Sequence, residues 1–169
     1  MNSLFPSTPH DKSKANAEHV VRLARQLADG NRPGVLSTVD AQGAPHIRWM
    51  ATLSLQDFPH LYALTSPQSR KVQHIRDCPK VNWMFTTDST SMVVNLQGSA
   101  TILTEQGDVN RIWRMIDNKS NAYFLGLDPE AEGVVVIDTL IEDIECVVPR
   151  YDLHYPMKTG GPFTQNDGQ

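Results

Sequence analysis

The sequence predicts a mainly β protein, an antiparallel barrel with a few helices. Segments rich in β-forming residues follow one another as hairpins, with few helical segments between them, and this order favours an antiparallel barrel over a doubly wound parallel sheet. The glycine patterns G-x-G-x-x-G and G-x-x-x-x-G-K-[ST] are absent from the 169 residues, so neither a Rossmann fold nor a P-loop fold is indicated. The length fits one domain with a core of ordinary size.

The predicted elements follow in the order α, βββ, α, ββ, α, ββ. An amphipathic helix is expected over Lys14–Ala28, where apolar residues recur at helical spacing. Strands at 34–40 and 44–55 form a hairpin around a glycine-containing turn. A strand at 60–66 leads into a helix that should end before Pro79, because a residue that precedes proline disfavours the helical region. The remaining elements are strands at 81–87 and 91–103, a helix at 106–118, and strands at 133–137 and 140–148.

The ends of the chain differ in composition from its middle. Both ends are rich in small and polar residues, so we expect flexible tails at residues 1–13 and 157–169 and one domain over residues 14–156. No apolar run approaches the length of a membrane span, and the N-terminus lacks the apolar centre of a signal peptide. We therefore expect a cytoplasmic protein without a membrane partner.

Charge and metal-ligand patterns exclude further classes of protein. The formal net charge is −4 and most cations are scattered, which does not favour binding to nucleic acid. The six histidines and two cysteines show no metal-ligand spacing and no C-x-x-C pair, so we predict no metal and no disulfide framework.

One helix start is electrostatically unusual. The helix that follows Thr65 and Ser66 opens with Ser69, Arg70 and Lys71. A helix N-terminus already carries partial positive charge from its unpaired N–H groups, so two cations there are unfavourable by themselves. An anion would resolve the conflict, because N–H groups, hydroxyls and two cationic side chains together suit a phosphate monoester. The pattern therefore predicts a phosphate site.

Several segments together resemble the pyridoxamine 5'-phosphate oxidase-like split-barrel flavoproteins. Their order and spacing match over about residues 34–104, and the S-R-K within Thr65–Lys71 is the most specific part. The matching segments are DAQGAPHIRWM at 40–50, LYALTSPQSRKVQHIRDCP at 61–79 and VVNLQGSATIL at 93–103. A looser likeness to the general stress protein 26 branch rests on Trp113, the AYFLGLDP segment at 122–129 and Ile141-Glu142.

The resemblance implies a six-stranded antiparallel split β-barrel of Greek-key type flanked by helices. It also implies bound FMN and a homodimer with one flavin in each of two clefts at the interface. FMN ends in a phosphate monoester, which agrees with the unusual helix start.

Carried over by position, the resemblance also assigns roles to residues of this chain. Arg48 would contact the phosphate or the ribityl chain, and Trp49 and Met50 would lie along the flavin edge. Thr65 and Ser66 would donate to the ring or the phosphate, and Ser69, Arg70 and Lys71 would hold the phosphate. Trp113 would lie near the flavin, and the polar residues expected to face the cleft are Asn95 and Gln97.

Each assignment has a structural alternative. Arg48 could point to solvent from its strand, and Arg70 could be an exposed helix residue that pairs with a carboxylate. Trp49 and Met50 could belong to the barrel core or to a dimer interface. Trp113 lies on an apolar helical face, where a core position is common.

The sequence departs from a true pyridoxamine 5'-phosphate oxidase. It lacks that enzyme's second phosphate site, and Leu53 stands where the oxidase has a lysine that faces its substrate. We therefore expect an FMN-dependent oxidoreductase that acts on a different small molecule, with hydride transfer through flavin N5 and a nicotinamide as electron donor.

Two other functions remain open. One is a non-catalytic or weakly catalytic flavin-binding stress-response protein. The other is a barrel that binds haem or the deazaflavin F420. Haem would need an axial ligand, and no motif supports His46 or His60 in that role.

Overall fold

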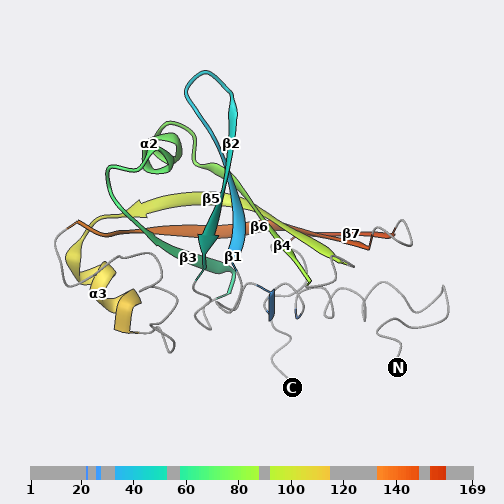
Figure 1. Ribbon diagram of the computed structural model, residues 1–169. Helices are drawn as coiled ribbons and strands as arrows, with labels where there is room; N and C mark the ends of the chain where they lie inside the picture. Colours follow the sequence, from blue (N-terminus) through green and yellow to red (C-terminus); the bar gives the residue numbers. More distant parts are fainter. Residues whose placement is uncertain are drawn as a thin grey trace.

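The computed structural model describes residues 22, 26–27, 33–52, 58–87, 92–114 and 133–148, together with the backbone of residues 153–158. Six antiparallel strands form a curled half-barrel to which a seventh strand, β7, is added, and helices α2 and α3 accompany it, so the predicted split-barrel class is confirmed (Figure 1). The elements are β1 (Pro33–Val39), β2 (Pro45–Ala51), β3 (His60–Thr65), α2 (Arg70–Asp77), β4 (Lys80–Thr86), β5 (Val93–Leu103), α3 (Gln106–Arg114), β6 (Val135–Val148) and β7 (Leu153–Lys158).

The long strand β6 organises the sheet. The strand order is β2-β1-β4-β5-β6-β3, every pairing is antiparallel, and β7 adds to β6. On one edge β6 pairs with β5, and on the other it pairs with β3 over its first half and with β7 over its second half. The end strands β2 and β3 approach each other without ladder pairing in the described residues, and this gap is the split in the barrel.

The structure corrects the sequence prediction at the last strands. The predicted strands at 133–137 and 140–148 are one continuous strand, because β5 supplies ladder partners on both sides of the expected break. A β-bulge absorbs the mismatch: Gln97 lies opposite Asp143 and Gly98 opposite Ile141, which leaves Glu142 as the extra residue. A Cβ at Gly98 would run into the carbonyl group of Leu140, so glycine permits this close approach.

Three predicted boundaries also change or lie outside the described residues. Strand β7 was not predicted, and its residues 157–158 fall within the segment expected to be a tail. The described residues 22, 26 and 27 of the first predicted helix are helical, and the rest of that helix lies outside the described residues, as does the end of α3 beyond Arg114. Within the described part of the chain, no helix is long and apolar enough to cross a membrane.

Alternating side chains fill the barrel. The largest fully buried ones include Trp83 and Phe85 of β4, Leu36 of β1 and Leu96 of β5. The Trp83 indole Nε1–H donates to Thr139 Oγ1 at 3.1 Å, so this buried donor is satisfied. A second apolar cluster lies on the opposite face of β3 and β6, where α3 packs. Its buried members are Tyr62, Leu64, Val109, Ile112, Trp113 and Val136.

Helix α2 connects the end of β3 to β4 and lies beside the β1–β2 hairpin, away from α3 (Figure 1). It buries Val72, His74 and Ile75 and packs against β1 and β5. The helix ends at Asp77, two residues before Pro79, as predicted. This arrangement places the start of α2 near the inner face of β2.

Candidate functional site

The start of α2 has the unusual composition that the sequence indicated. Ser69 is the N-cap residue and has extended backbone angles, but its side chain makes no capping hydrogen bond. The first turn contains no acidic residue, and Arg70 and Lys71 are its first two residues. The first turn therefore adds two positive charges to the partial positive charge of the helix end, and it contains no carboxylate that would balance them.

Lys71 lies across the end of β3. Its Nζ donates to Thr65 Oγ1 at 3.0 Å, and Thr65 Oγ1 lies 3.3 Å from Ser69 Oγ. Burial lowers the pKa of Lys71, and the positive charge of Arg48 lowers that pKa further. The ammonium group is thus held by the Thr65 hydroxyl in a place that disfavours its charge.

Arg48 approaches the same region from β2. Its side chain is half-buried on the inner side of the hairpin, and Nη1 donates to Thr38 Oγ1 at 2.7 Å and to the Leu36 carbonyl oxygen at 3.4 Å. Burial lowers the pKa of the guanidinium, and the charge of Arg70 lowers it as well. The structure therefore brings Arg48, Arg70 and Lys71 within electrostatic reach of one another.

No carboxylate in the described ranges pairs with any of these three cations. Arg48 and Lys71 are partly buried and Arg70 is exposed. Like charges near one another without a counter-ion are unfavourable, because the charges repel and burial weakens the hydration of the first two. A multivalent anion that contacts all three would remove both penalties. The group of Arg48, Thr65, Ser69, Arg70 and Lys71 is called the cation cluster below.

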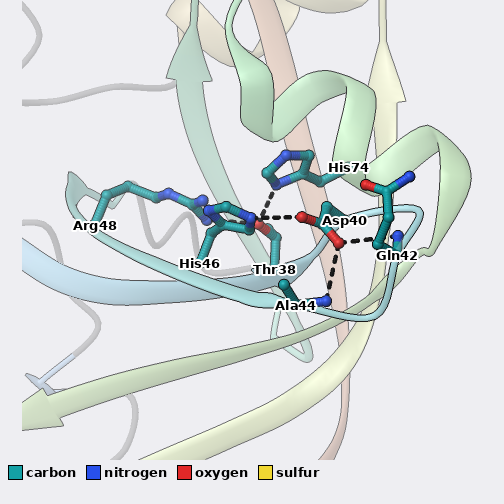
Figure 2. A network of polar contacts seen from close by, with 7 residues as sticks. All are labelled: Thr38, Asp40, Gln42, Ala44, His46, Arg48 and His74. Carbon is teal, nitrogen blue, oxygen red and sulfur yellow. Dashed lines mark hydrogen bonds and ion pairs between the residues drawn. The ribbon is translucent and has the colours of Figure 1, made fainter.

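A polar network adjoins the cation cluster on the hairpin side (Figure 2). The fully buried Thr38 hydroxyl, which Arg48 contacts, also lies 3.0 Å from His74 Nδ1 of α2. The rings of His46 and His74 have centroids 4.6 Å apart, and His46 Nε2 lies 2.8 Å from Asp40 Oδ2. The network thus links the hairpin to α2.

Asp40 fixes the turn that begins the network. Its Oδ1 accepts hydrogen bonds from the backbone N–H groups of Gln42 and Ala44, at 3.0 and 2.9 Å. The hydrogen bond with His46 and these backbone bonds lower the pKa of the Asp40 carboxyl. The anionic form is therefore favoured, and it holds His46 in place.

Sequence reasoning missed Thr38, Asp40, His46 and His74 as neighbours of the phosphate site. The hairpin register places Thr38 opposite His46 and Leu36 opposite Arg48, so these side chains share a face. The alternation of the two strands around the glycine turn was a signal that could have grouped them. The contact with His74 depends on how α2 packs, which the local sequence does not reveal.

Other predicted site residues do not belong to the cation cluster. Met50 is buried in the barrel core and Trp113 in the second apolar cluster. Trp49 is 69% exposed on the outer side of β2. Asn95 donates to Glu145 at 3.1 Å and Gln97 is exposed, both on the side of β5 that faces away from the core.

The remaining predicted residues lie near the cation cluster or outside the described residues. Ser66 stays near the cation cluster, where its carbonyl accepts from the Ser69 N–H at 3.1 Å. Leu53 and the segment 122–129 lie outside the described residues. In the part of the chain that the structure covers, His, Cys, Asp and Glu side chains do not gather in a group that could hold a metal ion.

Comparison with known protein families gives the class of the chain. The sequence matches the family model described as pyridoxamine 5'-phosphate oxidase over residues 22–146, which is well over half of the chain. The chain therefore belongs to the pyridoxamine 5'-phosphate oxidase family. No curated protein matches the sequence significantly.

Solved structures share the fold. General stress protein 26 from Bacillus anthracis is 27% identical, with a TM-score of 0.63 over 82% of this chain and 99% of the other. A pyridoxamine 5'-phosphate oxidase-related, FMN-binding protein from Nostoc punctiforme is 14% identical, with a TM-score of 0.58 over 86% of this chain and 95% of the other.

The fold also occurs with other cofactors. A haem-binding protein from Mycobacterium smegmatis is 14% identical, with a TM-score of 0.66 over 82% of this chain and 57% of the other. An F420 reductase is 16% identical, with a TM-score of 0.55 over 71% of this chain and 94% of the other. At these identities the likeness concerns the fold alone, so the choice of cofactor depends on the residues of this chain.

Proposed function

We propose that this protein binds FMN and that the cation cluster holds the FMN phosphate. The observation that carries the proposal is the convergence of Arg48, Arg70 and Lys71 without a carboxylate partner in the described residues. Family membership supports a phosphate-bearing cofactor, and one of the similar structures is an FMN-binding protein. Haem carries no phosphate. Its two propionate carboxylates could pair with cations, but each has a single charge, whereas the FMN phosphate brings a dianion to one point.

The donors of the cation cluster suit a phosphate monoester. Arg48 offers a planar guanidinium that keeps its charge, and Lys71 offers a compact ammonium. Ser69 and Thr65 add hydroxyl groups, and the uncapped first turn of α2 adds backbone N–H groups. A dianion at this point would favour the charged form of Lys71 and so oppose the effect of burial on its pKa.

We further propose that the protein is an oxidoreductase acting on a small molecule other than pyridoxamine phosphate. Acceptance and return of a hydride at the flavin ring is the chemistry that FMN supplies when bound. The chain's own residues hold the phosphate and fix the position of the cofactor. A flavin-binding protein with little turnover is the alternative, and a reduced nicotinamide is the electron donor that distinguishes the two.

The first prediction concerns cofactor affinity. Lys71→Met and Arg48→Met should each weaken FMN binding about 10- to 100-fold, because each removes one charge-assisted contact with the phosphate. Quenching of flavin fluorescence during titration measures the dissociation constant. Lys80→Met is the matched control, since Lys80 is an exposed lysine that pairs with Glu142 at 2.9 Å. Unchanged affinity in Lys71→Met and Arg48→Met would contradict the site.

The second prediction separates an enzyme from a binder. The FMN-loaded protein, mixed anaerobically with NADH or NADPH, should lose its flavin absorption band within seconds to minutes, and admission of an oxidised acceptor should restore it. Free FMN at the same concentration is the control. Absence of bleaching with both nicotinamides would favour the flavin-binding alternative over the oxidoreductase.

We also propose a homodimer that covers the outer side of β2. Ile47 and Trp49 are 74% and 69% exposed there, on either side of Arg48 in the sequence. Large apolar side chains that are exposed together mark interaction surfaces. A second copy seated on them would pack against the strand that carries Arg48, on the opposite side of β2 from the cation cluster.

The third prediction tests this dimer. Wild-type protein should sediment as a dimer, and Trp49→Arg should shift the equilibrium to monomer, because the interface would then have to bury a charge. Leu140→Arg serves as the control, since Leu140 is also exposed but belongs to β6. A monomeric wild-type protein, or a Trp49→Arg variant that remains fully dimeric, would contradict the proposal.

A further inference from the structure

Thr38 Oγ1 joins two side chains that have different hydrogen-bonding abilities. Arginine can only donate, so Thr38 Oγ1 accepts from Arg48 Nη1 across their 2.7 Å contact. The hydroxyl has one proton of its own, and His74 Nδ1 lies 3.0 Å from the same oxygen. A hydrogen-bond chain that runs from Arg48 through Thr38 to His74 Nδ1 gives Arg48 Nη1, the Thr38 hydroxyl and His74 Nδ1 a partner each.

The opposite direction of the hydrogen bond between Thr38 and His74 leaves a buried donor without a partner. If His74 Nδ1 carried a proton, Thr38 Oγ1 would accept twice and its own hydroxyl proton would need another acceptor. Thr38 is fully buried, and in the described residues its hydroxyl contacts only Arg48 and His74. An unsatisfied buried donor is destabilising by about 1 to 3 kcal/mol. Geometry therefore favours an unprotonated Nδ1.

Most of the charges around His74 lower its pKa. Burial lowers the pKa of His74, and His46 and Arg48 of β2 and Arg70 of α2 lower it further. Asp40, from the turn after β1, has the opposite effect, but its carboxylate is engaged by His46 and by two backbone N–H groups. The neutral imidazole is thus the favoured form, and the tilted His46 ring beside it restricts its position (Figure 2).

We infer that His74, as a neutral imidazole with its proton on Nε2, is a positioning residue that orients Arg48 toward the anion through the Thr38 hydroxyl. The inference rests on the proposed function, because it concerns the same phosphate site. A fixed acceptor at His74 orients the Thr38 lone pair toward Nη1, and the bonds of such a chain strengthen one another. The guanidinium N–H groups that do not contact Thr38 or Leu36 are thereby left available to the anion. His74 contributes to phosphate binding without touching the phosphate.

The hydrogen-bond chain from His74 through Thr38 to Arg48 is called the relay below. The affinity test uses pairs of variants at His74 and at Thr38. His74→Leu and Thr38→Val should each weaken FMN binding about 3- to 10-fold, the effect of one hydrogen bond. His74→Asn and Thr38→Ser should stay within about twofold of wild type, because Asn Oδ1 can take the place of Nδ1 and serine keeps the hydroxyl. If His74→Asn and Thr38→Ser weakened FMN binding as much as His74→Leu and Thr38→Val do, the relay would be overturned.

A double-variant cycle distinguishes the relay from a purely structural role. His74→Leu should have little further effect on FMN affinity in a Thr38→Val background, since both changes break the same chain. Additive effects would overturn the inference. Thermal unfolding of each variant shows whether it is folded, and the Thr38 pair keeps the test decisive if His74→Leu fails to fold.

The tautomer is measured without any cofactor. In ligand-free protein labelled with ¹⁵N-histidine, two-bond ¹⁵N–¹H correlation spectra at pH 7.5 should show Nδ1 of His74 unprotonated and Nε2 protonated, with His74→Asn used for assignment. A proton on Nδ1 would overturn the relay. Failure of wild-type protein to bind FMN would instead contradict the proposed function, and the tautomer would still decide whether the relay exists.

Discussion

Mutual repulsion among Arg48, Arg70 and Lys71 is the constraint on which the interpretation of this structure depends. Burial lowers the pKa of Arg48 and of Lys71, and each is lowered further by another cation of the cluster. Such an arrangement lowers stability unless an anion joins it, so it indicates a binding site more strongly than a structural ion pair would. The hydroxyls of Thr65 and Ser69 narrow that anion to an oxygen-rich group such as a phosphate ester.

The fold assembles the cation cluster from two distant segments. Strand β3 leads through a short turn into α2, which fixes Thr65, Ser69 and Lys71 relative to one another. Arg48 reaches them because the β1–β2 register sets it on the inner side of the hairpin, opposite Leu36. The packing of α2 on β1 then brings His74 against Thr38, so the same contact that holds the helix also holds the arginine. The Thr38 hydroxyl therefore links the packing of α2 to the position of Arg48.

Local features of the site could be predicted from the sequence, whereas features that depend on packing could not. The helix start at Ser69-Arg70-Lys71 and its stop before Pro79 follow from capping and proline rules. The continuity of β6 did not follow, because β5 decides it from a distant part of the chain. The same limit applies to Asn95, whose side of β5 depends on the register, and to the Thr38–His74 contact. Alternation within a strand shows which residues share a face but not which face is inward.

The comparison of FMN with riboflavin tests the central claim most directly, because the two molecules share the flavin ring and differ by the phosphate. Dissociation constants for both, measured by flavin fluorescence under the same buffer and salt, should differ by at least about 100-fold in favour of FMN, the effect of two or more charge-assisted contacts. The difference should shrink as ionic strength rises. Equal affinity for FMN and riboflavin would show that the three cations do not hold the phosphate and would contradict the account.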